Sequence, residues 1–229
     1  MLDVSIVFVT HRPEPRFEWF VDSLSAQLGS AAPDVVVVDG FHSAERVAEL
    51  EAIVRGRFRY RHVPPKPNPW NGPYRLTETE YFAAANARNT GVVHATGAYI
   101  AFVDDCAVLM PHWWDEVRQA ARHRYVVAGA YRKADGMVVE DGLLVESRDV
   151  DGGRDIQDVR WELGRDDGVT QCAGGQLYGC SLGVPRDLLV RVNGFDELCD
   201  PIGQSDCQFG IRLEWAGARI FYSLSLIHI

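Results

Sequence analysis

The sequence lacks any apolar run approaching the roughly 20 residues that a helix needs to cross a bilayer. Residues 1–20 also lack the pattern of a secretory signal peptide. Cysteine is scarce: the five present are an odd number at spacings unlike a zinc motif, which indicates reduced thiols. These absences predict a cytoplasmic protein without a membrane span.

Positive charge is in deficit, since the net charge of −9 argues against a general nucleic-acid-binding surface. No Gly-x-Gly-x-x-Gly follows the first expected strand and no Gly-Lys-Ser/Thr loop is present, so neither a dinucleotide-binding Rossmann domain nor an ATPase is favoured. The seven histidines include no His-x-x-x-His pair. A faint nucleophile elbow at 178–183 lacks the preceding strand and the histidine partner of a hydrolase.

What the sequence does contain is an alternation of apolar strands and amphipathic helices. In its first half this pattern predicts strands at 4–9, 34–39, 57–63 and 99–103, and helices at 14–28, 43–54 and from Thr77 or Thr79 to His94. Five prolines make 64–77 a long loop. Such an order predicts an α/β domain with a right-handed, mostly parallel sheet.

The second half has shorter elements. We expect a helix opened by Pro111, a strand at 125–131, a hairpin arm at 137–146 after an Asp135-Gly136 turn, and a mobile surface loop at 147–168. Short strands within 170–184, helices at 185–192 and 205–216, and a strand at 219–222 complete the expected elements.

A pair of carboxylates closes an apolar strand rich in β-forming residues, since Asp104 and Asp105 directly follow residues 99–103. Ligand sites of open α/β sheets lie beyond the carboxyl ends of such strands. Adjacent acids repel each other unless a cation lies between them, and a divalent metal carrying phosphate meets that need. A surface turn is the alternative interpretation.

Further charged residues fit the same interpretation. Asp39 ends the second strand and is expected at the same sheet edge as Asp104, while Asp206 lies at the start of the last helix. A carboxylate there can accept hydrogen bonds from a base or ribose, and Arg12 and Arg88 can complement phosphate. The pattern favours a nucleotide with a metal on its diphosphate.

Six segments of the chain, taken in order, carry a resemblance to a known family: 4–12, 35–40, 87–91, 96–106, 193–197 and 205–220. Over nearly its whole length the chain resembles the family 2 glycosyltransferases of GT-A fold. The resemblance implies a Rossmann-like, mostly parallel central sheet flanked by helices, with a small second antiparallel sheet. It also implies a nucleotide-binding half at 1–110 and an acceptor-binding half at 111–223.

The resemblance implies a metal-dependent, inverting transfer of a sugar from a nucleoside diphosphate sugar, with a UDP-sugar favoured, to an acceptor hydroxyl. Mn²⁺ or Mg²⁺ is the implied metal. The roles carried over are the base and ribose site (Thr10, Arg12, Asp39), the donor site (Arg88, Asn89, Asp104), the metal motif (Asp104, Asp105, Cys106) and the general base (Asp206).

Two departures from the family pattern matter. Cys106 occupies the third motif position, although hard cations such as Mg²⁺ and Mn²⁺ prefer oxygen. Ser205 replaces a glutamate that often orients the acceptor. A non-catalytic nucleotide-sugar-binding relative is therefore an alternative. A nucleotidyltransferase would share the metal site, but it should show a glycine-rich first loop with a lysine, which is absent.

The acceptor side is less informative, with Trp161, residues 179–181 and Gln204 as candidate contacts. A glycan, a small molecule or modified DNA are the acceptors we consider. Cationic and aromatic residues alternate at 55–62. This pattern is typical of a surface that binds phosphates and stacks bases, or of a charged edge strand that prevents pairing with other sheets.

Residues 224–229 resemble a translated sequencing adapter, which predicts a non-native tail on a metagenomic sequence. A viral source would favour hydroxymethylated DNA bases as acceptors.

Overall fold

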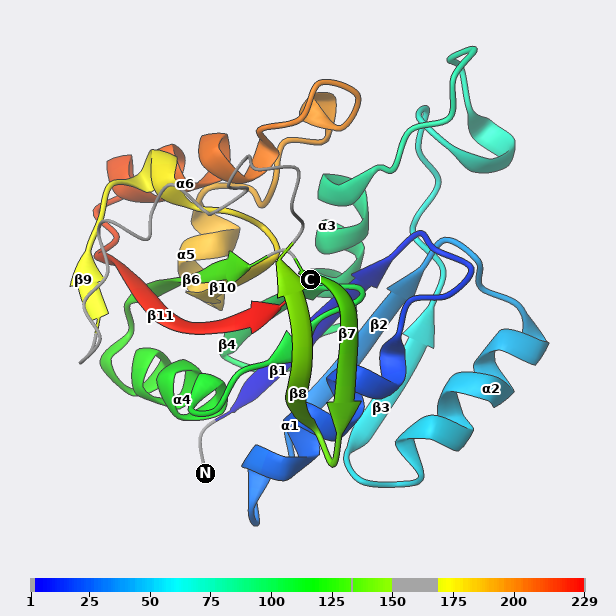
Figure 1. Ribbon diagram of the computed structural model, residues 1–229. Helices are drawn as coiled ribbons and strands as arrows, with labels where there is room; N and C mark the ends of the chain where they lie inside the picture. The colour runs from blue at the N-terminus through cyan, green and yellow to red at the C-terminus, as the bar shows by residue number, and fades with distance from the viewer. Residues whose placement is uncertain (1–2, 133, 150–168, 229) are drawn as a thin grey trace.

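A nine-stranded, mostly parallel sheet forms the centre of the computed structural model, which describes residues 3–132, 134–149 and 169–228 (Figure 1). A two-stranded antiparallel sheet lies beside it. No helix in these described residues is long and apolar enough to cross a membrane. Most of the expected loop at 147–168, with Trp161, lies outside the described residues.

The elements follow one another as the alternating sequence pattern predicts. The helices are α1 (Phe17–Leu28), α2 (Ala44–Val54), α3 (Ala84–His94), α4 (Trp113–His123), α5 (Arg186–Arg191) and α6 (Ser205–Trp215). The main sheet contains β1 (Val4–Thr10), β2 (Asp34–Asp39), β3 (Arg59–Val63), β4 (Tyr99–Asp104), β5 (Val108–Leu109), β6 (Val126–Arg132), β9 (Val169–Gln171), β10 (Ser181–Pro185) and β11 (Ile220–His228). The second sheet consists of β7 (Ala134–Glu140) and β8 (Leu143–Asp149).

The strand order of the main sheet is β3-β2-β1-β4-β10-β6-β11-β5, and β9 pairs with β11. The first four strands are mutually parallel, and the register aligns Thr10 with Asp39 and Val9 with Asp104. The chain proceeds from β1 to β2 on one side and returns to β4 on the other. The carboxyl ends of β1 and β4 therefore form a topological switch point, where such sheets bind ligands.

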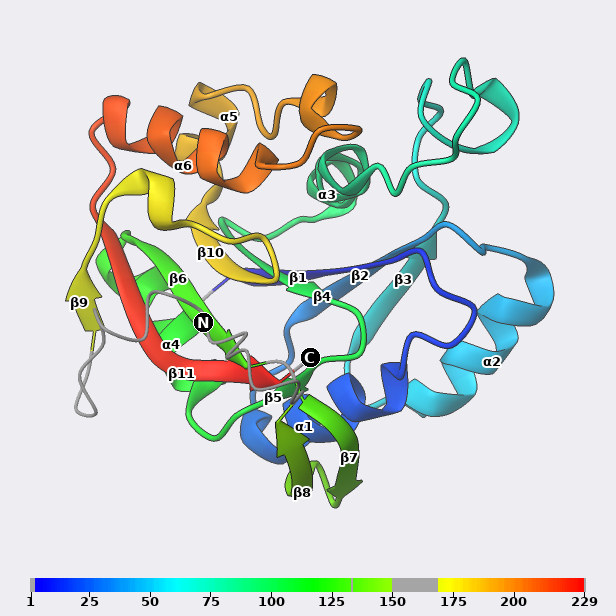
Figure 2. The ribbon, with the colours of Figure 1, turned by 45° about the horizontal axis from the view of Figure 1, so that its top comes forward.

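Both faces of the central strands are buried, which explains why their sequences are continuously apolar rather than alternating. Ile6 and Phe8 of β1 face a core shared with α1, α2 and α4, whereas Val7 and Val9 face a core shared with α3, α5 and α6. Figure 2 shows the two helical layers on opposite sides of the sheet. The GT-A-like layering predicted from the sequence is confirmed.

Two helices begin later than the sequence predicts. The expected helix at 14–28 begins at Phe17, because Arg16 adopts a left-handed conformation (φ 51°) after two prolines. The helix expected from Thr77 or Thr79 begins at Ala84. Its N-terminal amides are capped by a residue from a distant part of the chain, which no local capping pattern can reveal.

Other boundaries shift in the second half. The hairpin turns at Asp141 and Gly142, both in positive-φ conformations, so the expected Asp135-Gly136 turn is wrong and those residues belong to β7. The last strand is longer than the expected 219–222. It continues to His228, and its end pairs with β5.

Asp200 supplies the distant cap of α3. Its carboxylate accepts hydrogen bonds from the amides of Ala85 (2.6 Å) and Asn86 (3.1 Å). Burial raises the pKa of Asp200 to about 6, although the two amides oppose the shift. Because the folded state then binds the proton more tightly than the unfolded chain, the stability from this group is present at low pH and lost as the pH rises through about 6.

The pH dependence of this cap is measurable with Asp200→Asn, which keeps an oxygen acceptor without a charge. We expect the stability of the wild type relative to the variant to fall between about pH 4 and pH 6, the window between the ordinary pKa of 3.8 and the shifted value of about 6. Urea unfolding of both proteins across that range measures it. A difference that stays constant with pH would contradict the assignment.

Candidate active site

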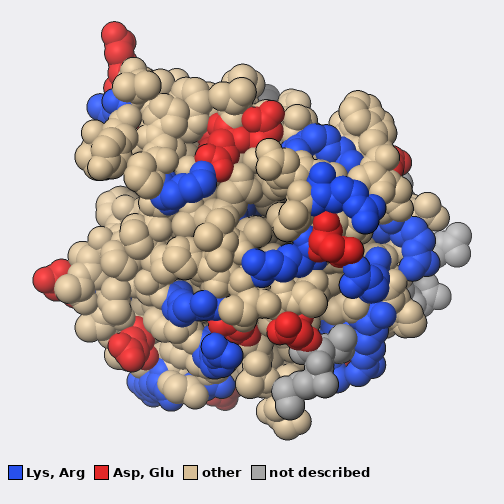
Figure 3. All heavy atoms as spheres, turned by 180° about the vertical axis from the view of Figure 1, so that it is seen from behind, with Lys and Arg blue, Asp and Glu red and all other residues tan. Residues whose placement is uncertain are grey.

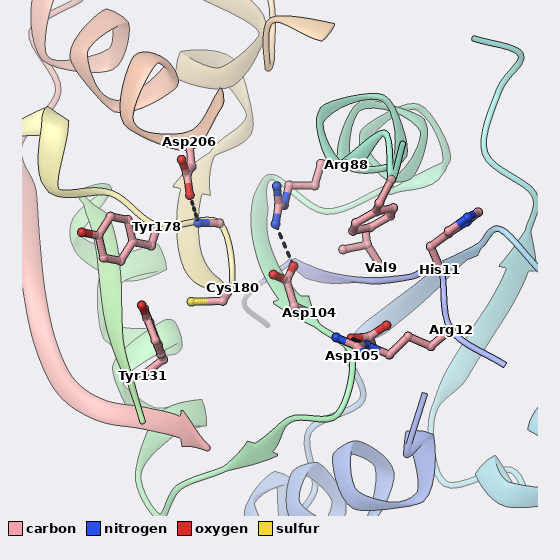
Figure 4. A pocket seen from close by; sticks show the side chains of 12 residues that line it. Val9, His11, Arg12, Arg88, Asp104, Asp105, Tyr131, Tyr178, Cys180 and Asp206 are labelled. Atoms are coloured by element: carbon pink, nitrogen blue, oxygen red, sulfur yellow. Dashed lines mark hydrogen bonds and ion pairs between the residues drawn. The ribbon is translucent and has the colours of Figure 1, made fainter. Parts of the chain in front are cut away.

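A pocket of about 560 Å³ opens beyond the carboxyl ends of β1 and β4, at the topological switch point (Figure 4). The loop before β10 and the start of α6 form its opposite wall. Its lining combines acids, arginines and aromatic rings: Val9, His11, Arg12, Phe82, Arg88, Asp104, Asp105, Tyr131, Tyr178, Gly179, Cys180 and Asp206. Five site residues predicted from the sequence are brought together here: Arg12, Arg88, Asp104, Asp105 and Asp206.

Asp104, the last residue of β4, is held by an arginine from α3. The Nη2 atom of Arg88 donates to Asp104 Oδ1 at 2.7 Å, and the Arg88 side chain is only 6% exposed. Burial opposes its positive charge, but Asp104 and Asp206 raise the pKa of Arg88 above its ordinary value. The guanidinium is therefore a fixed positive charge between two carboxylates.

Asp105 is held from the other side, by residues at the end of β1. Thr10 Oγ1 donates to one carboxylate oxygen at 2.7 Å, and Arg12 Nε donates to the other at 3.0 Å. Burial raises the pKa of Asp105, while these hydrogen bonds oppose the shift. Each acid of the motif thus has an arginine partner, which offsets the repulsion expected between adjacent carboxylates.

Cys106 is not among the residues that line the pocket. It adopts a left-handed conformation (φ 57°), its amide donates to Pro15 O at 2.8 Å, and its Sγ lies 3.9 Å from Glu14 O. Burial raises the pKa of the thiol, which disfavours the thiolate that binds metals. The cysteine serves here to attach the acidic motif to the loop after β1.

Asp206 faces the pocket from the first turn of α6 (Figure 4). The amide of Gly179 donates to its Oδ2 atom at 2.8 Å, and the amide of Cys207 donates to its Oδ1 atom at 2.9 Å. Gly179 has no room for a side chain, because an added Cβ atom would lie 2.4 Å from Arg88 Cζ. The glycine therefore allows Asp206 and Arg88 to share one wall.

Asp39, expected at the base and ribose, lies outside the pocket lining and is fully buried. Its carboxylate contacts the Phe41 amide at 2.8 Å, Arg46 Nε at 3.0 Å and His62 Nε2 at 3.2 Å. Burial alone would raise the pKa of Asp39, but these hydrogen bonds lower it below its ordinary value. Both carboxylate oxygens are thus engaged within the protein.

Asn89 also points away from the pocket. It bonds to the backbone of Phe195 in both directions (2.9 Å each) and donates to Glu197 at 2.7 Å. Burial opposes ionisation of Glu197, but hydrogen bonds from Asn89, Lys66 and Asn86 lower its pKa. The resemblance-based segment at 193–197 therefore docks against α3 and supports the helix that carries Arg88.

Aromatic side chains of the pocket were not predicted from the sequence. His11 stacks on Phe82, with ring centroids 5.7 Å apart and an interplanar angle of 13°. Tyr131 and Tyr178 pair at 5.9 Å, across the charged residues from His11 (Figure 4). Among these rings, only His11 could have been predicted to line the pocket, because it directly follows Thr10 at the end of β1. The other rings come from segments that are distant in the sequence.

The fold and the site define an α/β domain with a pocket and an acidic motif at its topological switch point. The glycosyl transferase family 2 model matches residues 5–176, and the chain belongs to this family. A comparison with curated protein sequences finds no match.

Among solved structures, the chain is similar to TarS of S. aureus, residues 1–349 in complex with UDP, with a TM-score of 0.65 and 15% identity over 100% of this chain and 60% of that chain. It is also similar to the mannosyltransferase PcManGT of Pyrobaculum calidifontis, in complex with GDP-Man and Mn²⁺, with a TM-score of 0.63 and 17% identity over 99% and 56%. A third similar structure is GalNAc-T7 with UDP, GalNAc and Mn²⁺, with a TM-score of 0.65 and 12% identity over 100% and 43%. The chain thus spans about half the length of these structures.

The close approach of Gly179 to Arg88 makes Gly179→Ala a test of this wall. We expect it to destabilise the protein by about 1–3 kcal/mol, because the guanidinium must move from its partners. Thermal or urea unfolding measures the change. Gly175→Ala is the matched control, since its added Cβ would meet Ile211 at an ordinary 3.9 Å. Equal effects of the two substitutions would contradict the geometry.

Proposed function

We propose that the protein transfers a sugar from a nucleoside diphosphate sugar, with UDP as the favoured nucleotide, to an acceptor hydroxyl with inversion of the anomeric centre. The observation that carries this proposal is the arrangement of Asp104 and Asp105 beside two arginines, with Asp206 on the opposite wall. Complexes of similar structures with UDP, UDP-GlcNAc and GDP-Man support a donor of this class.

The pocket offers distinct surroundings for the parts of such a donor. Arg12 and Arg88 supply positive charge for a diphosphate at the centre, where guanidinium groups favour phosphate oxygens. His11 and Phe82 present flat rings on one side, suited to stacking a base. The sugar would then lie toward Cys180 and Asp206. Cys180 carries the carbonyl that accepts a hydrogen bond from the Asp104 amide at 3.2 Å.

The residues present fit a divalent cation that arrives with the diphosphate. Within the described residues, no three His, Cys, Asp or Glu side chains group into a metal site. Mg²⁺-type sites, however, often use only one or two carboxylates together with substrate phosphates. Asp104 would hold such an ion through the carboxylate oxygen that does not accept from Arg88, with Asp105 beside it. When bound, Mn²⁺ or Mg²⁺ would neutralise negative charge on the departing diphosphate.

Asp206 is the proposed general base. As the bond between the anomeric carbon and the diphosphate oxygen breaks, the acceptor oxygen forms a new bond to that carbon. The proton of the acceptor hydroxyl passes to the Asp206 carboxylate. The electron pair of the broken bond between the anomeric carbon and the diphosphate oxygen leaves with the nucleoside diphosphate. The Gly179 amide fixes the orientation of Asp206 during this step. Arg88 and Arg12 stabilise the negative charge that grows on the leaving group.

Nothing in the basic segment at 55–62 favours modified DNA over other acceptors. β3 is an edge strand of the sheet, and two of the arginines in this segment are paired, Arg57 with Asp22 and Arg61 with Asp34. Figure 3 shows basic side chains in separate groups with acids between them on the face seen from behind. The edge-guarding interpretation is the better supported one.

Catalysis is tested with Asp206→Asn, which retains an oxygen acceptor for the Gly179 amide but cannot take a proton. We expect kcat to fall by about 10²–10⁴ while the affinity for UDP changes little. Release of nucleotide from a panel of nucleotide sugars, with hydroxylated acceptors and Mn²⁺, measures the rate. Nucleotide binding without wild-type turnover above this variant would instead support the non-catalytic relative.

Metal binding should depend on the nucleotide, because the protein supplies too few ligands on its own. Titration calorimetry is expected to show weak Mn²⁺ binding to the free protein and at least about tenfold tighter binding with UDP present. Asp104→Asn should remove most of this enhancement. Equal Mn²⁺ affinity with and without UDP would contradict the proposed arrangement.

A further inference from the structure

The loop between β1 and α1, residues 11–16, lies between two sets of anchors. On one side it meets the acidic motif, through Arg12 on Asp105 and through the Cys106 amide on Pro15 O at 2.8 Å. On the other side it meets Arg46, in the first turn of α2. The loop therefore transmits the position of α2 to the side chain that reaches the diphosphate region.

Arg46 contacts the loop through a buried guanidinium that donates hydrogen bonds to two backbone carbonyls of the loop. Nη1 donates to Pro13 O at 2.7 Å and Nη2 donates to Arg12 O at 3.1 Å, while Nε donates to the buried Asp39 at 3.0 Å. The Arg46 side chain is only 10% exposed. A planar guanidinium can satisfy three acceptors in a fixed geometry, whereas a lysine ammonium on the same stem cannot reproduce that fork.

The helix that carries Arg46 is itself fixed at this point. Ser43 caps α2 by accepting a hydrogen bond from the Arg46 amide at 3.1 Å. Asp39, at the end of β2, is the residue expected to contact the nucleotide, but its oxygens are directed at Arg46, His62 and the Phe41 amide. A carboxylate saturated in this way, and fully buried, is an anchor for the guanidinium.

We propose that Arg46, anchored by Asp39, is a positioning residue of the donor site: it fixes the backbone of Arg12 and Pro13 so that the Arg12 side chain is presented to the pocket. This inference rests on the proposed function, because it assumes that Arg12 meets the diphosphate. It reassigns Asp39 from a nucleotide contact to the buried support of that loop. Its consequence is an energetic coupling between Arg46 and Arg12 in nucleotide binding.

A double-mutant cycle of Arg46→Lys and Arg12→Ala, read as the Kd for UDP in the presence of chelator, tests the coupling. We expect Arg46→Lys to weaken binding about tenfold in the wild-type background and less than about threefold when Arg12 is already alanine. Glu49→Gln is the matched control. It removes an exposed carboxylate 3.6 Å from Arg46 Nη1 and leaves the three contacts intact, so its Kd should equal that of the wild type.

A purely structural role would lower the unfolding temperature of Arg46→Lys without changing the Kd of the folded protein, and this result would overturn the inference. Equal losses in the two backgrounds would overturn it as well. Arg46→Gln, which buries no charge, replaces the lysine variant if that variant does not fold.

Hydrogen exchange tests whether Arg46 fixes the loop at residues 11–16, without any measurement of nucleotide binding. The amides of Arg12, bonded to Thr10 Oγ1 at 3.2 Å, and of Cys106 should exchange at least about tenfold faster in Arg46→Lys than in the wild type. Unchanged exchange at both amides would overturn the proposal. If the wild type fails to bind UDP, the proposed function fails, and the exchange rates alone judge the role of Arg46.

Discussion

The buried ion pair between Arg88 and Asp104 is the interaction on which the rest of the site depends. A guanidinium that is 6% exposed would be costly without a partner, and breaking such a pair by removing one member typically costs about 3–5 kcal/mol. Its position also dictates its neighbours. Gly179 must lack a side chain where the guanidinium passes, and Phe195 lies under it at 5.6 Å from ring centroid to Cζ. Asp206 gains a nearby positive charge.

Because Arg88 extends from α3, the position of its guanidinium in the site depends on the contacts that hold this helix in place. Asp200 caps the first amides of α3, and Asn89 on the helix bonds to the Phe195 carbonyl. Asp200 and Phe195 both lie more than 100 residues later in the chain than their partners on α3. The loop after β3 joins the same network, since Trp70 Nε1 donates to Glu197 O at 3.0 Å. The first half and the second half of the chain thus share one polar network around α3.

Local pattern was enough to predict the layers of the fold and most of its strands. Continuous apolar runs such as 99–103 identify strands buried on both faces, and the acids that follow this run lie at the edge of the sheet where the pocket opens. The start of α3 and the hairpin turn could not be placed this way. One is capped by the distant Asp200, and the other uses one of two similar Asp-Gly pairs.

The same limit applies to the candidate site. The rule for strand ends, together with the resemblance to the family, was enough to bring together Arg12, Arg88, Asp104, Asp105 and Asp206. They could not show which carboxylates are already satisfied within the protein. Asp39 and Asp104 look alike in sequence, each ending a buried strand, yet one is enclosed by Arg46 and His62 while the other faces the pocket. That difference depends on tertiary contacts that no motif encodes.

A crystal structure of the full chain with UDP and Mn²⁺, with the manganese located by anomalous scattering, would test whether the pocket binds the nucleotide and whether Asp104 binds the metal. We expect manganese at about 2 Å from Asp104 and from the diphosphate oxygens, the distance typical of Mg²⁺-type ions. Arg88 should remain on the other oxygen of Asp104, and Asp206 should face the side where the sugar is attached. Nucleotide density outside this pocket, or manganese bound away from Asp104, would contradict it.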